Sequence, residues 1–220
     1  MKEAVFSLFT ILAVLVFCTS IAHGRGMQHV TYGSTVKLLN VDLQKRLHSH
    51  DIKYGSGSGQ QSVTGIETKN DGNSYWLVKG ETRKPYVRGA LIECGSTIRL
   101  EHLETKKNLH SHHVRAPLSH GKQEVSAFGD SKGEGDNGDH WIVVCSGDFW
   151  KRDKPILLQH IDTDAYLAAT GNVYGGPIHG QIEIVGDQFR NSPGLQWMAV
   201  EGVFIHPNDF KAQHNAHTEL

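Results

Sequence analysis

The tetrapeptide Leu-His-Ser-His occurs at residues 47–50 and again, unchanged, at residues 109–112. Features on both sides of it recur too. Gly33 and Gln61 return as Gly95 and Gln123 at the same spacing as the tetrapeptide, and Trp76 returns as Trp141 at a slightly longer spacing. An internal repeat of this kind restricts the chain to folds that are assembled from equivalent units.

A third and weaker copy follows the second. Leu167 takes the place of Leu109, and Trp197 takes that of Trp141, both at a slightly shorter spacing than the one between the first two copies. The histidines are missing from this copy, because Ala168-Ala169-Thr170 follows Leu167. We therefore expect three units, of which two carry the His-Ser-His element.

The first unit has the pattern of four short strands joined by turns. Val36 and Leu38 alternate with polar neighbours, which is typical of a half-buried strand. Further strands are predicted at residues 46–50, 61–64 and 74–78, and no longer stretch carries the apolar stripe of a helix. Three such units predict an all-β protein, specifically a β-trefoil whose units share one core.

The matched tryptophans Trp76, Trp141 and Trp197 are expected to lie in that core. The alternative is that they are exposed and stack against a ligand, which is a common use of aromatic side chains in binding proteins.

Both ends of the chain carry targeting features. Residues 1–22 form a short apolar run that ends in small residues, as in a cleaved secretory signal peptide. The alternative is an uncleaved anchor, for which the run is short. The last four residues, His217-Thr218-Glu219-Leu220, resemble the endoplasmic reticulum retrieval signal, with Thr at the usual Asp position. A polar tail without an address is the alternative.

Charge and length exclude some classes of function. The 220-residue chain has a formal net charge of -1, which gives no argument for nucleic acid or for an anionic membrane as a partner. Its length suits one compact domain or two small ones. The fifteen histidines predict a surface charge that responds to mild acidification, if many of them titrate near their usual pKa.

Two cysteines, Cys94 and Cys145, remain once the signal segment with Cys18 is removed. In an oxidising compartment two such thiols usually pair. They flank the second unit, whose ends lie close together if the unit closes on itself, so a disulfide is predicted. Two separate buried thiols are the alternative.

The residues of the repeat resemble a known module. The first unit's Gly-Ser-Thr-Val-Lys-Leu, Leu-His-Ser-His and Ser-Tyr-Trp resemble the MIR domain, and residues 108–113 and 123–129 sharpen this to the stromal cell-derived factor 2 family. The resemblance implies a β-trefoil over residues 23–202, with MIR repeats at about 27–81, 89–145 and 148–202. A tail that carries the retrieval signal then occupies residues 203–220.

The two His-Ser-His elements are the first candidates for a binding site. On a strand, residues two apart point to the same face, so each pair of imidazoles could reach one ligand. A metal site usually needs three or four ligands, and the threefold axis separates the pairs, so no metal is predicted. Structural hydrogen bonds or a partner-binding face are the other readings. The candidates are His48, Ser49, His50, His110, Ser111 and His112.

Two glycine-rich loops are weaker candidates. Gly57 and Ser58 belong to a loop that is predicted to be flexible, and they are included as possible binding residues. Residues 133–138 match a dinucleotide fingerprint by chance, since they lie between strands and carry acids that repel phosphate. They fit no calcium loop either, and we expect an exposed acidic loop that is open to a partner.

No catalytic signature is present in the sequence: neither a Gly-x-Ser-x-Gly elbow nor a His-Glu-x-x-His motif occurs. No cofactor is predicted. The family resemblance implies a non-catalytic luminal adaptor, with an Hsp70-type chaperone, a J-domain co-chaperone and unfolded client polypeptides as its partners. The rival reading is a mannose-type lectin. It expects an acid at matched positions of several repeats, and Asp51 is replaced by His113 in the second unit.

Overall fold

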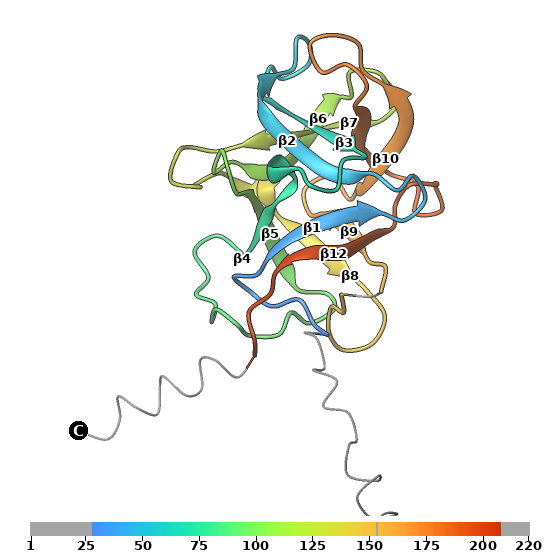
Figure 1. The fold of residues 1–220 in the computed structure, drawn as a ribbon. Coiled ribbons are helices and arrows are strands. Elements are labelled where there is room, and N and C mark those ends of the chain that lie inside the picture. The colour runs from blue at the N-terminus through green and yellow to red at the C-terminus, as the bar shows by residue number, and fades with distance from the viewer. Residues whose placement is uncertain (1–27, 153, 208–220) are drawn as a thin grey trace, which may run out of the picture.

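The computed structural model describes residues 28–152 and 154–207, and these ranges consist almost entirely of β-strands and turns (Figure 1). The signal segment at residues 1–22 and the tail at His217–Leu220 lie outside the described residues. Within the described ranges, no helix has the length and apolar character needed to cross a membrane.

Each unit contributes four strands in chain order. The first unit holds β1 (Thr35–Asn40), β2 (Arg46–Lys53), β3 (Gln61–Ile66) and β4 (Trp76–Gly80). The second holds β5 (Thr97–His102), β6 (Asn108–Arg115), β7 (Gln123–Phe128) and β8 (Trp141–Val144). The third holds β9 (Leu157–His160), β10 (Tyr166–Val173), β11 (Ile182–Asp187) and β12 (Trp197–Val203). Short 3₁₀ turns precede β4 and β8, at η1 (Gly72–Ser74) and η2 (Asn137–Asp139).

The first and fourth strands of the units form a closed, barrel-like sheet, visible in the lower half of Figure 1. β1 pairs with β12 and β4, β5 pairs with β4 and β8, and β8 pairs with β9. A bridge between Ile156 and Trp197 joins the last unit back to the ring. Closure leaves no free edge strand in this part of the sheet, which protects it from pairing with other chains.

The second and third strands of the units form hairpins that lie over one end of the barrel (Figure 1). Their third strands meet one another, as β3 with β7, β7 with β11, and β11 with β3. Leu47, Leu109 and Leu167 pair with Gly65, Ala127 and Gly186 in the three hairpins. The third unit therefore keeps the same strand register although its sequence has lost the histidines.

The matched tryptophans tie each fourth strand to the hairpin of its own unit. Trp76, Trp141 and Trp197 have no exposed surface. Their indole Nε1–H groups donate to the main-chain carbonyls of Leu47, Leu109 and Leu167, at 3.0, 2.9 and 2.9 Å. The predicted core position is confirmed, and the ligand-stacking alternative is excluded by this burial.

A second threefold set joins each unit to its neighbour. It consists of the buried last residues of β1, β5 and β9, namely Asn40, His102 and His160. Their side chains contact the carbonyls of Gly194, Asn73 and Gly138, which lie in the turns before β12, β4 and β8, at 2.7, 2.9 and 2.8 Å. These contacts are structural, and they account for two of the fifteen histidines.

One detail of the fold differs from the predictions, and another confirms them. The fourth strand of the first unit begins at Trp76 and not at Ser74, because residues 72–74 form η1 and Ser74 Oγ is held by Asp71 Oδ2 at 2.7 Å. The predicted disulfide is confirmed. It joins Cys94, just before β5, to Cys145, just after β8, with a Cα–Cα distance of 5.3 Å.

Candidate functional site

The first histidine of each His-Ser-His element is buried and bonded to an acid from the turn before the fourth strand. His48 Nδ1 lies 3.0 Å from Asp71 Oδ2, and His110 Nδ1 lies 2.9 Å from Asp139 Oδ1. Both imidazoles are 4% exposed. They hold the hairpin of their unit against its 3₁₀ turn, and little of either imidazole is exposed to a protein partner.

The serines of the two elements are also internal. Ser49 Oγ donates to the carbonyl of Ser62 at 2.8 Å, and Ser111 Oγ donates to that of Glu124 at 2.9 Å. These bonds cross the hairpins β2–β3 and β6–β7, at buried positions. Of the predicted tetrapeptide candidates, only His50 and His112 are partly exposed. Any binding surface in this region therefore lies beside the tetrapeptides, and most tetrapeptide atoms are buried beneath it.

In the first unit the two imidazoles form a relay. Burial lowers the pKa of His48, and hydrogen bonds from Ser74 and His48 outweigh burial to lower the pKa of Asp71. An ionised Asp71 can only accept, so neutral His48 donates from Nδ1 and accepts at Nε2 from His50 Nδ1, 2.9 Å away. Burial, followed by the electrostatic interaction with His48, also lowers the pKa of His50. The other ring nitrogen of His50, Nε2, lies 3.4 Å from the hydroxyl of the buried Ser62. This chain of hydrogen bonds therefore ends inside the protein, where no substrate can reach it.

The second unit replaces this relay with a pair of carboxylates. Asp139 is completely buried, and burial raises its pKa. Asp136 Oδ1, on the exposed side of the same turn, lies 3.5 Å from His110 Nδ1. Asp136 belongs to the loop at residues 133–138 that was expected to be exposed, and its side chain is 58% exposed, whereas the turn η2 folds the next acid, Asp139, inward against His110.

The loop at Gly57 and Ser58 is anchored to the neighbouring unit. Ser58 donates from both its Oγ and its main-chain N to the carboxylate of Glu124, a buried residue of β7. His112 Nε2 lies 3.2 Å from the same carboxylate. Ser58 is therefore engaged in holding two repeats together, and the binding role of Gly57 and Ser58 stays a prediction.

Gly57→Ala is expected to destabilise the protein more than Gly59→Ala. Both glycines have a positive φ, at 68° and 67°, so both substitutions carry backbone strain. Only at Gly57 would a Cβ collide with the Glu124 carboxylate; at Gly59 it meets nothing within 4 Å. Displacing the buried carboxylate from Ser58 should cost about 2 kcal/mol beyond the strain. Urea unfolding of the two variants measures the difference. Equal losses of unfolding free energy would contradict the role of the Ser58–Glu124 contact in stability.

Three clefts lie at equivalent places in the three units, each between the second strand of one unit and the turn after the next first strand. The first is lined by His50, Asp51 and Glu104, and the third by Thr170, Gly171 and Asp42. Their volumes are about 390 Å³ and 210 Å³. The second cleft is much larger, at about 890 Å³.

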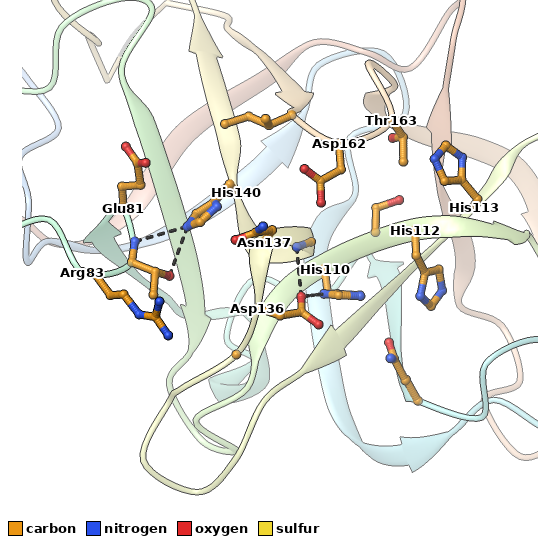
Figure 2. A pocket seen from close by; sticks show the side chains of 16 residues that line it. Glu81, Arg83, His110, His112, His113, Asp136, Asn137, His140, Asp162 and Thr163 are labelled. Carbon is orange, nitrogen blue, oxygen red and sulfur yellow. Dashed lines mark hydrogen bonds and ion pairs between the residues drawn. The ribbon is translucent and has the colours of Figure 1, made fainter.

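The second cleft is polar and open (Figure 2). Its base is formed by His110 and Asp136, and its walls by His112 and His113 of β6, Asp162 and Thr163 of the turn after β9, and His140 with residues 81–83. Within the described part of the chain, the exposed side chains of Arg83, His113 and Asp162 make no hydrogen bond or ion pair. They are available to a ligand, in contrast to the buried tetrapeptide atoms.

The third unit shows what the site becomes without its polar groups. Ala168 and Leu195 stand where the second unit has His110 and Asp139. Both are buried in a small apolar cluster with Ala116, Tyr166 and Val185. At these two positions apolar packing replaces the His–Asp bond, and the Asn40 side chain still donates to the carbonyl of Gly194 in the turn. The third unit can therefore keep the fold without His-Ser-His.

Sequence reasoning missed the acids of this site. Asp71 and Asp136 are separated by the same spacing as Trp76 and Trp141, and that spacing was a usable signal. A second signal is the set Asp42, Glu104 and Asp162, which recurs at the same spacings as the three matched leucines and lines all three clefts. The replacement of Asp51 by His113 thus gave an incomplete test for a repeated acid, since Asp42, Glu104 and Asp162 do recur.

Comparison with known proteins gives consistent matches. The family model described as MIR domain matches residues 38–144. Stromal cell-derived factor 2 of Bos taurus is 51% identical over 191 residues, which cover 87% of this chain and 89% of that protein.

Solved structures agree with the sequence matches. The crystal structure of the SDF2-like protein from Arabidopsis thaliana superimposes with a TM-score of 0.78 at 44% identity, over 82% of this chain and 99% of that one. The Saccharomyces cerevisiae protein O-mannosyltransferase Pmt1–Pmt2 complex bound to the sugar donor has a TM-score of 0.70 at 21% identity. This match covers 96% of the chain and 35% of the transferase chain, and it shows a shared fold alone.

Proposed function

We propose that this chain, which belongs to the stromal cell-derived factor 2 family, is a non-catalytic binding protein of the endoplasmic reticulum lumen. In this proposal it is an adaptor in a chaperone complex, with an Hsp70-type chaperone, a J-domain co-chaperone and unfolded client polypeptides as its partners. It acts in protein folding, quality control and the unfolded-protein response. The Cys94–Cys145 disulfide supports an oxidising compartment.

We also infer that the fold is a β-trefoil. The threefold correspondence of the strand pairs supports this, as do the three equivalent tryptophan bonds. In such a fold each unit presents a similar surface. A surface feature that one unit has and the others lack is therefore a candidate for the binding site. The second unit differs most, since its cleft is the largest of the three.

The observation that carries the adaptor proposal is the second cleft and its free side chains. Arg83, His113 and Asp162 offer both signs of charge around an open volume of about 890 Å³. A polar, mixed-charge surface of this kind suits a polypeptide partner that binds reversibly, since it contributes specificity more than affinity.

Affinity capture from a luminal extract tests the adaptor proposal. The bait is the mature chain, and the captured proteins are identified by mass spectrometry. Recovery of an Hsp70-type chaperone together with a J-domain protein is the expected result. Robust binding to mannose-type glycans on an array, without either chaperone in the captured fraction, would overturn it in favour of a lectin.

The lectin remains a second candidate because of the recurring acid. Asp42, Glu104 and Asp162 are exposed and each lines one cleft, where a carboxylate could accept hydrogen bonds from sugar hydroxyls. The described residues that line these clefts include no Trp, Tyr or Phe to stack on a sugar ring. This difference makes the adaptor the better supported function.

A further inference from the structure

We propose that the second repeat binds a divalent transition-metal ion such as Zn²⁺ through His110 Nδ1, Asp136 Oδ1 and Asp139 Oδ1. This site goes beyond the adaptor function and does not depend on it. No metal site is predicted from the sequence, because each pair of histidines alone offers too few ligands. The structure supplies the missing ligands from the turn η2.

The three donor atoms already lie close to the spacing that a metal requires. The imidazole nitrogen is 2.9 Å from the Asp139 oxygen and 3.5 Å from the Asp136 oxygen, and all three atoms lie within 4.8 Å of one another. Ligands of a tetrahedral zinc ion at bond lengths of about 2.0–2.2 Å are separated by about 3.3 Å. Small side-chain movements would therefore bring the set to coordination distance.

The carboxylates are held in place by bonds that leave coordinating positions available. Asp139 Oδ2 accepts from the main-chain N of Asp136 at 3.0 Å and from Asn108 Nδ2 at 3.2 Å, which leaves Oδ1 facing His110. Asp136 Oδ1 accepts from the main-chain N of Gly138 at 2.9 Å. The imidazole itself packs against Phe128, with ring centroids 4.9 Å apart. Such outer contacts orient ligands in metal sites and raise the affinity.

The balance of charge favours a cation here. Two carboxylates face one imidazole, and one of them, Asp139, is completely buried. A metal ion would take the place of the proton that now lies between His110 and Asp139. The Asp136 side chain is 58% exposed and lines the open cleft (Figure 2), so a bound ion would be open to solvent on the side of Asp136. Three protein ligands and an open position are typical of zinc sites that also take a water or a further ligand.

The other two units provide an internal comparison. In the first unit Asp71 corresponds to Asp136, but Ser74 stands in place of Asp139, so only one carboxylate faces the histidine. In the third unit the histidine and the second acid are Ala168 and Leu195. Among the described residues, the His-Asp-Asp set occurs in the second unit alone. The same turn geometry thus exists with and without the ligand set.

Isothermal titration of the tag-free mature chain with Zn²⁺ at pH 7.5, after chelator treatment, tests the site. Wild type is expected to show one tight site, with the affinity lowered about tenfold or more in Asp136→Asn and in Asp139→Ser. Asp139→Ser places in the second unit the residue that the first unit has at the equivalent position, Ser74. Asp71→Asn, at the corresponding place in the first unit, is the control and should retain wild-type affinity.

Asp136→Asn keeps an acceptor for the Gly138 N–H and lies on the exposed side, so it separates metal loss from misfolding. Near-ultraviolet circular dichroism checks the fold of each variant. Zn²⁺ should also raise the melting temperature of wild type more than that of Asp136→Asn. Equal zinc affinity in wild type and both second-unit variants, or no tight site in wild type, would overturn the proposal.

Discussion

Replacing both Cys94 and Cys145 with serine is expected to lower the free energy of unfolding by about 4 kcal/mol. The bond closes a loop with a sequence separation of 51 residues, and its loss returns that loop's conformational entropy to the unfolded chain. It also removes the covalent link between the two ends of the second unit, which are then held by the pairing of β5 with β8 and by the bridge between Glu93 and Phe149. Urea unfolding at pH 7 measures the change.

Reduced wild-type protein is the matched control for this pair of substitutions. It should unfold at the same urea concentration as the double serine variant, because both lack the same cross-link. A loss below about 1 kcal/mol would mean that the barrel pairing alone fixes the ends of the second unit, which contradicts the role assigned to the disulfide.

Acidification from pH 6.5 to pH 4 is expected to remove about 3 kcal/mol of stability through His102 alone. Burial lowers the pKa of His102 to about 4, whereas the unfolded chain has the ordinary value of 6.5. The unfolded state therefore binds more protons across this window, so the stabilising contribution is complete above pH 6.5 and is lost as the pH falls toward 4. Burial lowers the pKa of His48, His50, His140 and His160 in the same direction.

The protein itself suggests the control for this effect. Asn40 occupies the place of His102 in the first unit and donates to the matching carbonyl, of Gly194, without titrating. His102→Asn should therefore show a flatter dependence of unfolding free energy on pH between 6.5 and 4. An unchanged slope would contradict the assignment. These shifts also correct one expectation, since buried histidines do not contribute surface charge on mild acidification.

The repeat and its strands were predictable because they rest on local pattern and on spacing. The offsets between Leu47 and Leu109, and between Trp76 and Trp141, define equivalent strands before any contact is known. Core burial of the tryptophans follows from the same offsets, since equivalent residues in equivalent units occupy equivalent environments. The disulfide could be predicted because Cys94 and Cys145 lie at the two ends of one unit.

The role of the tetrapeptide was not predictable in the same way. Alternation on a strand places His48 and His50 on one face, but it does not say what covers that face. The cover comes from Asp71 and, in the second unit, Asp139, which lie in or beside 3₁₀ turns with no periodic signature. The size of the second cleft is likewise set by the loops after β4 and β9, which no repeat pattern describes.

Capture of the J-domain co-chaperone by cleft variants tests the central claim that the second unit carries the partner-binding surface. The variant His113→Ala/Asp162→Asn removes two exposed side chains of the second cleft, and Asp51→Ala/Glu104→Gln makes the matching change in the first. We expect capture from luminal extract to fall about fivefold or more only in the second-unit variant. Undiminished capture by that variant, or a loss confined to the first-unit variant, would contradict the account.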